Sequence, residues 1–406
     1  MAGPISLDEA RAVVLAAAEP LPAVEVSLAQ ALEMHLAADV VAEAPLQRFD
    51  NSAMDGYAVR AADLGGAAAS PVALTLVGES RAGHPAAAAV GPGEAIAIST
   101  GAMLPEGADT VVRVEDTTSA DGRVEITVSP APDANVRRAG EDVAAGEVVL
   151  RRGTALGPAA LGLLAALGIE TVACHRRPRV AIVTSGDELV PPGEPLPPGG
   201  IRDSNSTMLA ALLARAGAEL HSSGAAGDSL EATVAALEPA LAADAVIVSG
   251  GVSVGEHDHV KQALAQLGVE QGFWRVALRP GGPAFFGHRA GTLVFGLPGN
   301  PVSVFVTFTL LAAPGLAALA GGSPQRHRAT ATLAAPYEKG TDRTEAARCD
   351  LELTDAGWAA TPRPRQGSHV LTSLLDADCL AILPGPARRF EAGERVEVEL
   401  LAGSLP

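Results

Sequence analysis

The sequence predicts a multidomain α/β protein built around a three-layer α/β domain. Two observations carry this prediction. Between residues 178 and 322, short hydrophobic runs alternate with helical segments, which is the pattern of a parallel sheet covered by helices on both faces. On either side of this region, short β-like runs follow one another with Gly, Pro and Asp between them. At 406 residues the chain is also too long for one hydrophobic core.

The N-terminal part predicts a helical linker domain, residues 1–46 and 137–177, interrupted by a β-rich domain, residues 47–136. Ser6 and Glu9 form a capping-box pattern for a helix that ends near Ala18. By the same logic Ser27 and Gln30 predict a second helix that ends near residue 38. A third helix is expected between Pro158 and Gly168. The strands of the β-rich domain are expected at 72–77, 95–98, 110–114 and 124–128.

The α/β domain, residues 178–322, alternates predicted strands and helices. The strands are expected at 179–184, 218–222, 245–249, 274–277 and 292–295, and the helices at 206–215, 229–241, 260–267 and 301–311. A linker of the sequence GGSP follows. A small C-terminal β-barrel-like domain, residues 323–406, completes the chain, with strands expected at 329–333, 349–353, 379–383 and 395–400.

Composition argues against several classes of function. The chain has 29 basic and 47 acidic residues and a net charge of −18, which disfavours nucleic acid or an acidic membrane surface as a partner. Cys174, Cys349 and Cys379 form no CxxC pattern, so buried reduced thiols are expected. We find no basic leader and no apolar stretch of about 18 residues. We therefore expect a cytoplasmic protein with no membrane contact and no nucleic-acid partner.

The most informative segment is the buried strand predicted at 245–249 and the turn that follows it. Gly250 and Gly251 come directly after the strand, and Ser253, Gly255 and Asp258 follow. Polar turns also follow two other predicted strands, with the residues Thr184, Ser185, Gly186, Pro298, Gly299 and Asn300. Because the carboxyl ends of parallel strands meet at one edge of a sheet, these turns predict a single ligand crevice there.

Structural roles explain part of this pattern. The turn after residue 184 can simply cap a helix, and Asn300 is expected as a helix N-cap. Ser204 and Asn205 also stand where caps are favoured, a role compatible with binding an anion at the same helix start. The longer run 250–261 is harder to explain by turning alone and favours phosphate or pterin binding. Its H-D-H string, 257–259, is not a standard zinc pattern.

Two further regions carry polar signals. Arg279 begins a rigid cationic loop, Arg-Pro-Gly-Gly-Pro, whose guanidinium suits an oxyanion. In the β-rich domain, loops around Asp55, Thr100 and Asp142 carry carboxylates and a hydroxyl. Each of these loops alone is more often a solvated turn than a site.

Taken together, these segments resemble the molybdopterin molybdenumtransferase family, which includes MoeA and the E domain of gephyrin. The matching strings occur in the family's order between residues 49 and 369: NSAMDGYA, ISTGAMLPEGADTVV, VRRAGEDV, TSGDELV, SGGVSVGEHD, FWRVALRPGGP, GLPGNPVS and QGSH. The resemblance implies an enzyme that takes adenylylated molybdopterin and molybdate, inserts molybdenum at the dithiolene sulfurs and releases AMP. It also implies a Mg-dependent reaction and an elongated homodimer, in which the α/β domain of one chain and the β-rich lid of the other share a site. Other molybdenum cofactor enzymes are further candidate partners.

The resemblance assigns roles residue by residue. The functional polar set falls on Asp55, Thr100, Asp142, Glu188, Asp228 and Asp258. Magnesium is expected on Glu188, Asp228 and Asp258, since this ion takes one or two carboxylates together with phosphate oxygens and water. Molybdopterin is expected on Thr184, Ser185, Gly186, Ser204, Asn205, Gly250, Gly251, Ser253, Gly255, Pro298, Gly299 and Asn300. Molybdate is expected on Arg279, Pro298, Pro301, Arg343 and Ser368.

The chain departs from the family at one position. The family's loop usually reads K-P-G-K-P, whereas here it reads R-P-G-G-P, so Gly282 stands in place of the second cation. Three explanations follow. Another basic residue (Arg275, Arg343 or Arg348) substitutes, or the affinity for the oxyanion is lower, or the chain is a specialised paralogue that handles, for example, tungstate.

Two other functions remain as alternatives. The molybdopterin adenylyltransferase carries molybdopterin with ATP and resembles the α/β domain alone, so the two flanking β domains argue against it. A non-enzymatic scaffold, as gephyrin is for receptors, is disfavoured by the nearly complete acidic set.

Overall fold

We describe the protein from a computed structural model, in which residues 3–252, 259–324 and 327–401 are described. Contacts divide the chain into two compact units. The first consists of Met1–Ala37, Gly153–Gly157 and Thr171–Pro406, and the second of Ala38–Arg152 and Pro158–Glu170. The boundaries of the four predicted domains stay predictions.

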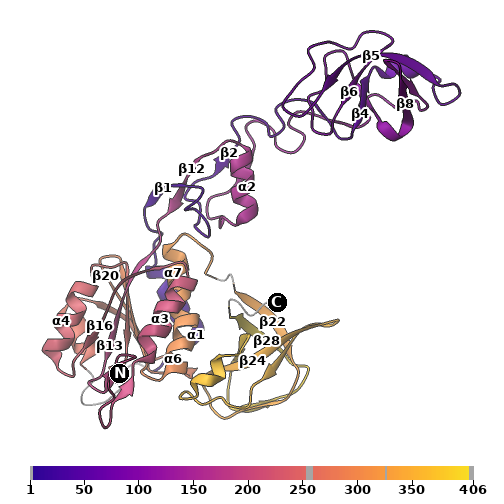
Figure 1. The fold of residues 1–406 in the computed structure, drawn as a ribbon. Helices are drawn as coiled ribbons and strands as arrows, with labels where there is room; N and C mark the ends of the chain where they lie inside the picture. Colours follow the sequence, from indigo (N-terminus) through magenta and orange to yellow (C-terminus); the bar gives the residue numbers. More distant parts are fainter. Residues whose placement is uncertain (1–2, 253–258, 325–326, 402–406) are drawn as a thin grey trace. The chain divides into compact units, whose positions relative to one another are not determined.

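A six-stranded sheet forms the centre of the first unit (Figure 1). Its strands lie in the order β16-β13-β17-β21-β20-β18. The first four strands are parallel to one another, β20 runs antiparallel to them, and the edge strand β18 pairs antiparallel with β20 and so runs in the direction of the first four. The central strands are continuous apolar runs because helices bury them on both faces. The bounds are β13 (Arg179–Ser185), β16 (Glu219–Ala226), β17 (Ala245–Ser249), β18 (Glu270–Trp274), β20 (Phe285–Arg289) and β21 (Thr292–Leu297).

Helices cover both faces of this sheet, so the predicted three-layer architecture is confirmed (Figure 1). Leu209 and Leu213 of α3 belong to the core on one face, together with residues of α1, α6 and α7. Leu237 of α4 and Ala263 of α5 belong to the core on the other face. The bounds are α1 (Leu7–Ala17), α3 (Ser204–Arg215), α4 (Leu230–Ala240), α5 (Val260–Gln266), α6 (Pro301–Thr307) and α7 (Ala313–Leu319).

Two expectations about this domain are wrong. The strand expected at 274–277 does not form, because β18 ends at Trp274 and Arg275 takes a φ of +77°, which a strand cannot continue. The expectation that no long apolar stretch occurs also fails. Pro301–Leu319 runs through α6, the π-helical segment η3 (Phe308–Ala312) and α7, and it is long and apolar enough to span a membrane by length and composition. In this stretch 72% of the residues are buried inside the protein, and the apolar side chains form part of its core.

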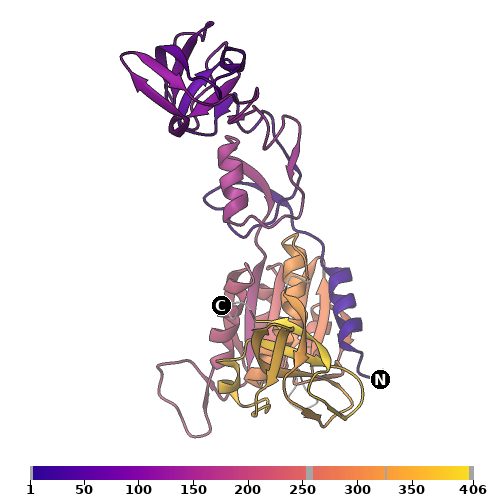
Figure 2. The same cartoon turned by 90° about the vertical axis from the view of Figure 1, so that its right-hand side faces the viewer.

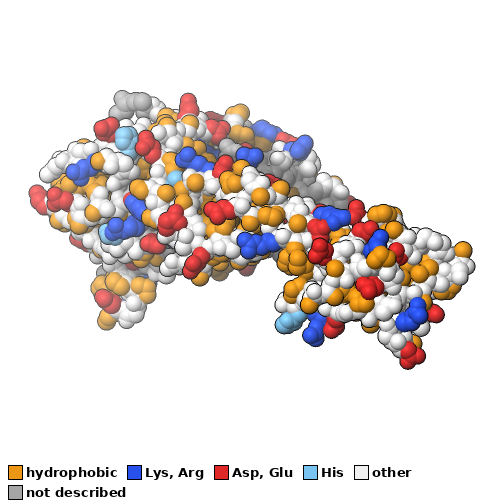
Figure 3. Space-filling view, turned by 90° about the horizontal axis from the view of Figure 1, so that it is seen from above, with side chains coloured by type: hydrophobic (Ala, Val, Ile, Leu, Met, Phe, Trp, Pro, Cys, Tyr) orange, Lys and Arg blue, Asp and Glu red, His pale blue; other side chains and the backbone are white. Residues whose placement is uncertain are grey.

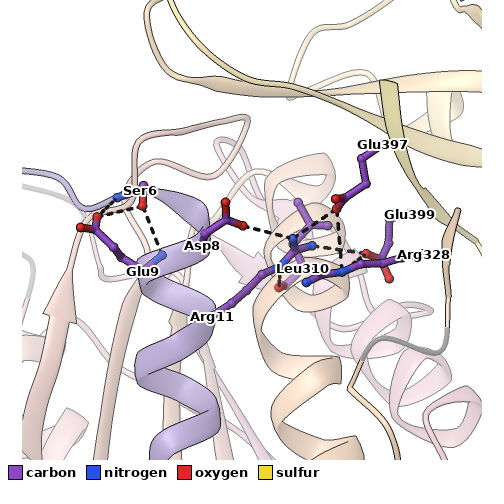
Figure 4. Close-up of polar contacts among 8 residues, drawn as sticks. All are labelled: Ser6, Asp8, Glu9, Arg11, Leu310, Arg328, Glu397 and Glu399. Atoms are coloured by element: carbon purple, nitrogen blue, oxygen red, sulfur yellow. Dashed lines mark hydrogen bonds and ion pairs between the residues drawn. The ribbon is translucent and has the colours of Figure 1, made fainter. Parts of the chain in front are cut away.

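The predicted capping box of α1 is confirmed. The Ser6 hydroxyl accepts a hydrogen bond from the Glu9 backbone N–H, and the Glu9 carboxylate accepts one from the Ser6 N–H. Further along this helix, the buried Arg11 donates to the Leu310 carbonyl at 3.1 Å and to the Glu399 carboxylate at 3.3 Å (Figure 4). Arg11 thereby connects α1 with η3 and with the last strand of the C-terminal domain. Asp8, Arg328 and Glu397 complete the cluster.

The helix expected from Ser27 to residue 38 is wrong, because this segment forms turns. The Ser27 hydroxyl donates to the Gln30 side chain instead of accepting from a backbone N–H, so no capping box exists. Glu33 also takes a φ of +61°, which a right-handed helix excludes. The preceding strand β1 (Ala23–Ser27) pairs with β12 (Thr171–His175).

The C-terminal domain is a closed five-stranded barrel, as predicted. The order β24-β25-β22-β28-β26 closes because β24 also pairs with β26. Buried side chains such as Leu333, Ala347 and Val398 fill the core. A two-residue strand of the α/β domain, β19 (Leu278–Arg279), adds to β24 in parallel. The bounds are β22 (Arg328–Leu333), β23 (Tyr337–Lys339), β24 (Thr344–Thr354), β25 (Gly357–Pro362), β26 (Cys379–Leu383), β27 (Arg388–Phe390) and β28 (Arg395–Leu400).

The second unit contains the predicted β-rich lid. Its sheet has the order β7-β4-β6-β5-β9-β8, and two-stranded pairs β10–β3 and β11–β2 and helix α2 accompany it. The bounds are β2 (Val40–Val41), β3 (Asn51–Ser52), β4 (Gly56–Val59), β5 (Val72–Ser80), β6 (Glu94–Ile98), β7 (Thr110–Arg113), β8 (Thr117–Ala120), β9 (Arg123–Ile126), β10 (Val136–Arg137), β11 (Val148–Leu150) and α2 (Pro158–Ala166).

Candidate active site at the carboxyl edge of the sheet

The turns that follow β13, β17 and β21 pack against one another. The Gly250 N–H donates to the Leu297 carbonyl at 3.0 Å. A Cβ added to Gly250 would lie 2.6 Å from the Ser185 carbonyl oxygen, and the φ of Gly250 is +89°, so this position requires glycine. The structure therefore brings three of the predicted turns together at one edge of the sheet.

Asn205 connects these turns to α3. Its side-chain amide donates to the Ser249 hydroxyl at 3.0 Å and to the Gly299 carbonyl at 2.7 Å. Asp203, which was not among the predicted site residues, is the N-cap of α3, and its carboxylate also accepts from the Thr184 hydroxyl at 3.2 Å. The D-S-N-S string marks a cap, but the contact with Thr184 depends on the fold and has no local signal.

Carboxylates gather at the ends of β13 and β16. The Asp187 N–H donates to the Asp228 carboxylate at 3.4 Å, and the Asp228 N–H donates to the Asp187 carboxylate at 3.3 Å. The Glu188 carboxylate folds over Gly186, with an oxygen 2.5 Å from where a Cβ of residue 186 would be. Asp187 is a second residue that the predicted set missed, although it adjoins Glu188. Beyond them, the segment that leads to α3 protrudes as a long loop (Figure 2).

Part of the predicted site lies outside the described residues: Ser253, Gly255 and Asp258. Within the residues that the structure describes, no group of three His, Cys, Asp or Glu side chains is arranged around a metal position. Glu188 and Asp228 remain as carboxylates at the same edge of the sheet.

The predicted lid residues Asp55, Thr100 and Asp142 belong to the second unit. The Asp55 carboxylate accepts from the Thr100 N–H at 2.7 Å and from the Thr100 hydroxyl at 3.1 Å. Asp55 follows β3, and Thr100 follows β6, so the sheet brings them together from 45 residues apart. Asp142 is exposed in the loop between β10 and β11.

Arg279 is paired with a buried acid of the barrel. Its Nη1 lies 3.7 Å from the Glu345 carboxylate, and the two residues are register partners in β19 and β24. The other oxygen of Glu345 accepts from the Tyr337 hydroxyl at 2.7 Å. Burial, and then this carboxylate, raise the pKa of Tyr337 well above its ordinary value, so the hydroxyl stays protonated.

Arg343 lies at the position where the second cation of the loop is missing. A Cβ added to Gly282 would stand 2.8 Å from Nη1 of Arg343. Among the three basic residues considered as substitutes, Arg348 is fully buried. Arg343 is exposed and is the one whose guanidinium adjoins Gly282.

Ser368 lies against the start of α6. Its hydroxyl accepts from the Asn300 side-chain amide at 3.3 Å, and its carbonyl accepts from the Val302 N–H at 3.3 Å. Asn300 stands at the N-cap position with Pro301 after it, but its side chain makes no cap hydrogen bond. The expectation that Asn300 caps the helix is therefore right in position and wrong in contact, because the amide binds Ser368 instead.

The face of the protein that Figure 3 shows has no continuous basic patch. Acidic and basic side chains are interspersed there, in a chain whose net charge is −18. The net charge would not attract an anion, so an anion would have to be bound by local groups.

Three family models match successive parts of the chain. The MoeA N-terminal region (domain I and II) matches residues 5–168, a probable molybdopterin binding domain matches 181–318, and the MoeA C-terminal region (domain IV) matches 330–401.

Curated relatives match over nearly the whole length. The molybdopterin molybdenumtransferase of Haemophilus influenzae is 37% identical over 97% of this chain and 98% of its own. Molybdopterin molybdenumtransferase 2 of Mycobacterium tuberculosis is 40% identical over 92% and 94%. The crystal structure of the molybdopterin biosynthesis moeA protein from Pyrococcus horikoshii OT3 superposes with a TM-score of 0.85 and 30% identity, over 98% of this chain and 100% of that one. The resemblance seen in the sequence is thus confirmed, and the chain belongs to the MoeA family of molybdopterin molybdenumtransferases.

Proposed function

We propose that the protein inserts molybdenum from molybdate into adenylylated molybdopterin and releases AMP, as a step of molybdenum cofactor biosynthesis. One observation carries the proposal. Two enzymes named for this transfer match 97% and 92% of the chain at 37% and 40% identity, and family models match both flanking regions as well as the α/β domain. A molybdopterin adenylyltransferase would need only the α/β domain.

The crevice at the carboxyl edge of the sheet is the proposed site for the pterin and its phosphates. Glycines at 250 and 299 let the backbone approach a ligand closely, and the Thr184 and Ser185 side chains add hydroxyls. Asn205 holds the β17 and β21 turns at a fixed spacing through its two hydrogen bonds. We assign the remaining members of the predicted set, Gly186, Ser204, Gly251, Ser253, Gly255, Pro298 and Asn300, to the same site.

Magnesium would be held by Glu188 and Asp228, with Asp258 as a third candidate. The donor set fits this ion, because carboxylate oxygens at an exposed edge leave room for the phosphate oxygens and water that Mg²⁺ prefers. When bound, the ion would neutralise charge on the pyrophosphate and on the departing AMP. The contacts between Asp187 and Asp228 keep the Asp228 loop against the end of β13.

Molybdate, a tetrahedral dianion, is proposed to bind near Arg279, Arg343 and Ser368, with Pro298 and Pro301 shaping the wall. Arg343 replaces the missing cation in space, since its guanidinium lies against Gly282. Glu345 holds one side of Arg279 and leaves its other donors for the oxyanion. The Ser368 hydroxyl is free to turn its proton toward an oxyanion, because it accepts the bond from Asn300.

We further propose a homodimer in which Asp55, Thr100 and Asp142 of one lid complete the site of the partner chain. Other molybdenum cofactor enzymes are proposed as delivering or receiving partners. The three cysteines are free and buried, which fits a reducing compartment such as the cytoplasm.

AMP release tests the function. The purified protein is incubated with adenylylated molybdopterin, Mg²⁺ and either molybdate or tungstate, and AMP is measured by chromatography. We expect AMP release that depends on the oxyanion, and the ratio of the two responses gives the metal preference. Formation of an AMP adduct from molybdopterin and ATP, without molybdate, would support the adenylyltransferase instead. Full activity of D55A and E188A variants in a deficient strain would point to a scaffold.

A further inference from the structure

Lys339 is a lysine buried in the C-terminal barrel domain. It ends β23, and only 3% of its surface is exposed. Its ammonium group donates to the backbone carbonyls of Thr341 at 2.8 Å, of Pro386 at 3.2 Å and of Gly385. An ammonium has three N–H donors, so these three carbonyls use all of them. The positive charge is therefore buried with complete hydrogen bonding, and that arrangement offsets the cost of removing it from water.

The ammonium joins two loops that lie far apart in the sequence. The first loop consists of residues 340–343, between β23 and β24, and the second of residues 384–387, between β26 and β27. A further contact connects the same loops, because the Ala387 N–H donates to the Asp342 carboxylate at 2.9 Å. The 340–343 loop is therefore anchored to the second loop twice, once through Lys339 and once through Asp342.

The anchored loop carries Arg343, the cation that lies against Gly282. The Arg343 backbone N–H donates to the Thr341 hydroxyl at 3.3 Å, and the Arg343 Nε donates to the same oxygen at 3.4 Å. Thr341 thus accepts two hydrogen bonds from Arg343 on its side chain and one from Lys339 on its carbonyl. Because one threonine connects the two residues, a movement of Thr341 would redirect the Arg343 guanidinium.

The same loop also adjoins Arg279. A Cβ added to Gly340 would lie 3.8 Å from Nη1 of Arg279. Directly after the loop, the Thr344 N–H donates to the Ala277 carbonyl at 2.8 Å, in the segment that leads into β19. The loop therefore lies beside both cations of the proposed molybdate site, and a displacement of the loop would change the separation of the two guanidiniums.

We propose that Lys339 is a positioning residue for the molybdate site, and that it acts by fixing the 340–343 loop that presents Arg343. This inference rests on the proposed function. Removal of the ammonium leaves three carbonyls without a donor, so both loops are expected to move toward water. The crevice for the pterin is expected to stay intact, because its contacts run through Asn205 and Gly250 in the α/β domain.

The test separates the two substrates. For K339M, which keeps an unbranched side chain without its donors, we expect the KM for molybdate to rise about fivefold. We expect the KM for adenylylated molybdopterin and the kcat at saturating molybdate to stay within about twofold of the wild type. K339R is expected to resemble K339M, because the planar guanidinium cannot direct its donors as an ammonium does. A general loss of stability would lower the melting temperature without separating the two KM values.

R388M is the matched control, because Arg388 is the register partner of Lys339 in the β23–β27 pair. Its guanidinium binds Glu394 at 2.8 Å and lies over the Phe390 ring, and among the described residues it makes no hydrogen bond to the 340–343 loop. R388M removes a cation from the same pair of strands and is expected to leave the KM for molybdate unchanged. An equal rise in R388M and K339M would show that any loss of charge there suffices, and would overturn the proposal.

A double-mutant cycle tests the route through Arg343. If Lys339 acts through this guanidinium, K339M combined with R343M raises the KM for molybdate no further than R343M alone. Multiplied effects of the two changes would show that Lys339 acts independently of Arg343, and the positioning role would be wrong.

A second variant covers the case in which K339M does not fold. T341V keeps the branched shape of the side chain and removes the oxygen that accepts both hydrogen bonds from Arg343, so it is expected to give the same selective rise in the KM for molybdate. If the wild type releases no AMP with molybdate, the proposed function fails. If the wild type responds but the folded variants K339M or T341V keep the wild-type KM for molybdate, the positioning role fails.

Discussion

The guanidinium of Arg343 occupies the space that a side chain on Gly282 would need, with Nη1 2.8 Å from the position of the added Cβ. The two residues lie in different domains of the first unit, one in the loop after β19 and the other just before β24. The chain therefore keeps two cations at this loop while its sequence shows only Arg279 there.

This relationship predicts a reciprocal rescue. R343M is expected to raise the KM for molybdate about tenfold, because one of two guanidiniums is lost. G282K in the wild-type background would force Arg343 aside, whereas G282K in the R343M background places a cation in emptied space and is expected to recover part of the affinity. The closest contact of the added Cβ, at 2.8 Å, is with the end of a flexible side chain, and the next, at 3.3 Å, is with the Leu278 carbonyl oxygen, so we expect only a modest fall in the melting temperature. A wild-type KM for R343M would contradict the assignment.

Asp55 and Thr100 give a prediction for the second unit. D55N keeps the shape of the side chain but removes the charge that receives two hydrogen bonds from Thr100. We expect AMP release to fall about 100-fold or more, as for a carboxylate that acts on reacting groups. Because Asp55 is exposed, the unfolding temperature of D55N should stay close to that of the wild type. D121N changes an exposed Asp in the turn between β8 and β9 of the same sheet and serves as the control. An equal loss of activity in both variants would disprove a specific role.

The carboxylates at the edge of the parallel sheet predict a magnesium dependence. E188Q and D228N are each expected to raise the Mg²⁺ concentration for half-maximal AMP release about tenfold, because each removes a negatively charged oxygen ligand. A chelator should abolish AMP release from the wild type, and added Mg²⁺ should restore it. E194Q, in the exposed loop after β14 (Leu189–Val190), is the control. Unchanged Mg²⁺ curves in both variants would exclude these residues as ligands.

Asp244 predicts how stability changes with pH. Burial alone would raise its pKa, but hydrogen bonds from the Arg176 guanidinium and the Arg179 N–H outweigh burial and hold the pKa below the ordinary value. A carboxyl whose pKa is lower in the folded state stabilises the protein above its ordinary pKa and loses this contribution as the pH falls through the folded value.

The corresponding experiment is denaturant unfolding as a function of pH. D244N is expected to be less stable than the wild type at pH 7, and the difference should shrink as the pH falls below the ordinary Asp pKa of about 4. A difference between D244N and wild type that stays constant through this range would mean that the charge of Asp244 does not carry the effect.

Local patterns predicted those parts of the fold that are set by local chemistry. The apolar run of β17 and the capping box of α1 are examples, because burial on two faces and a side chain bonding three residues away each leave a short signature. Ser27 and Gln30 show the same capping-box pattern, but no helix forms there, because Ser27 belongs to β1, which pairs with β12, and Glu33 has a positive φ. β25 was not predicted, since its sequence GWAATP lacks an apolar run and its pairing comes from β24 and β22.

The site was predictable in kind and not in geometry. Glycines and hydroxyls after strands indicate a crevice, and the structure brings those of β13, β17 and β21 together. The contacts between Arg343 and Gly282 and between Arg348 and Gly367 join residues from separate segments, so no spacing in the sequence reveals them.

The parallel addition of β19 to β24 has a consequence for synthesis on the ribosome. Ile5 binds the segment around Val276, and the same segment passes directly into β19, which the barrel strand β24 then extends. Ile5 can therefore form its backbone hydrogen bonds only after the segment around Val276 has been synthesised. That segment continues into β19, which in turn can pair only after β24 has been synthesised. Nascent chains that stop before residue 344 leave one side of β19 without its partner strand, and we expect them to be recognised by chaperones and proteases.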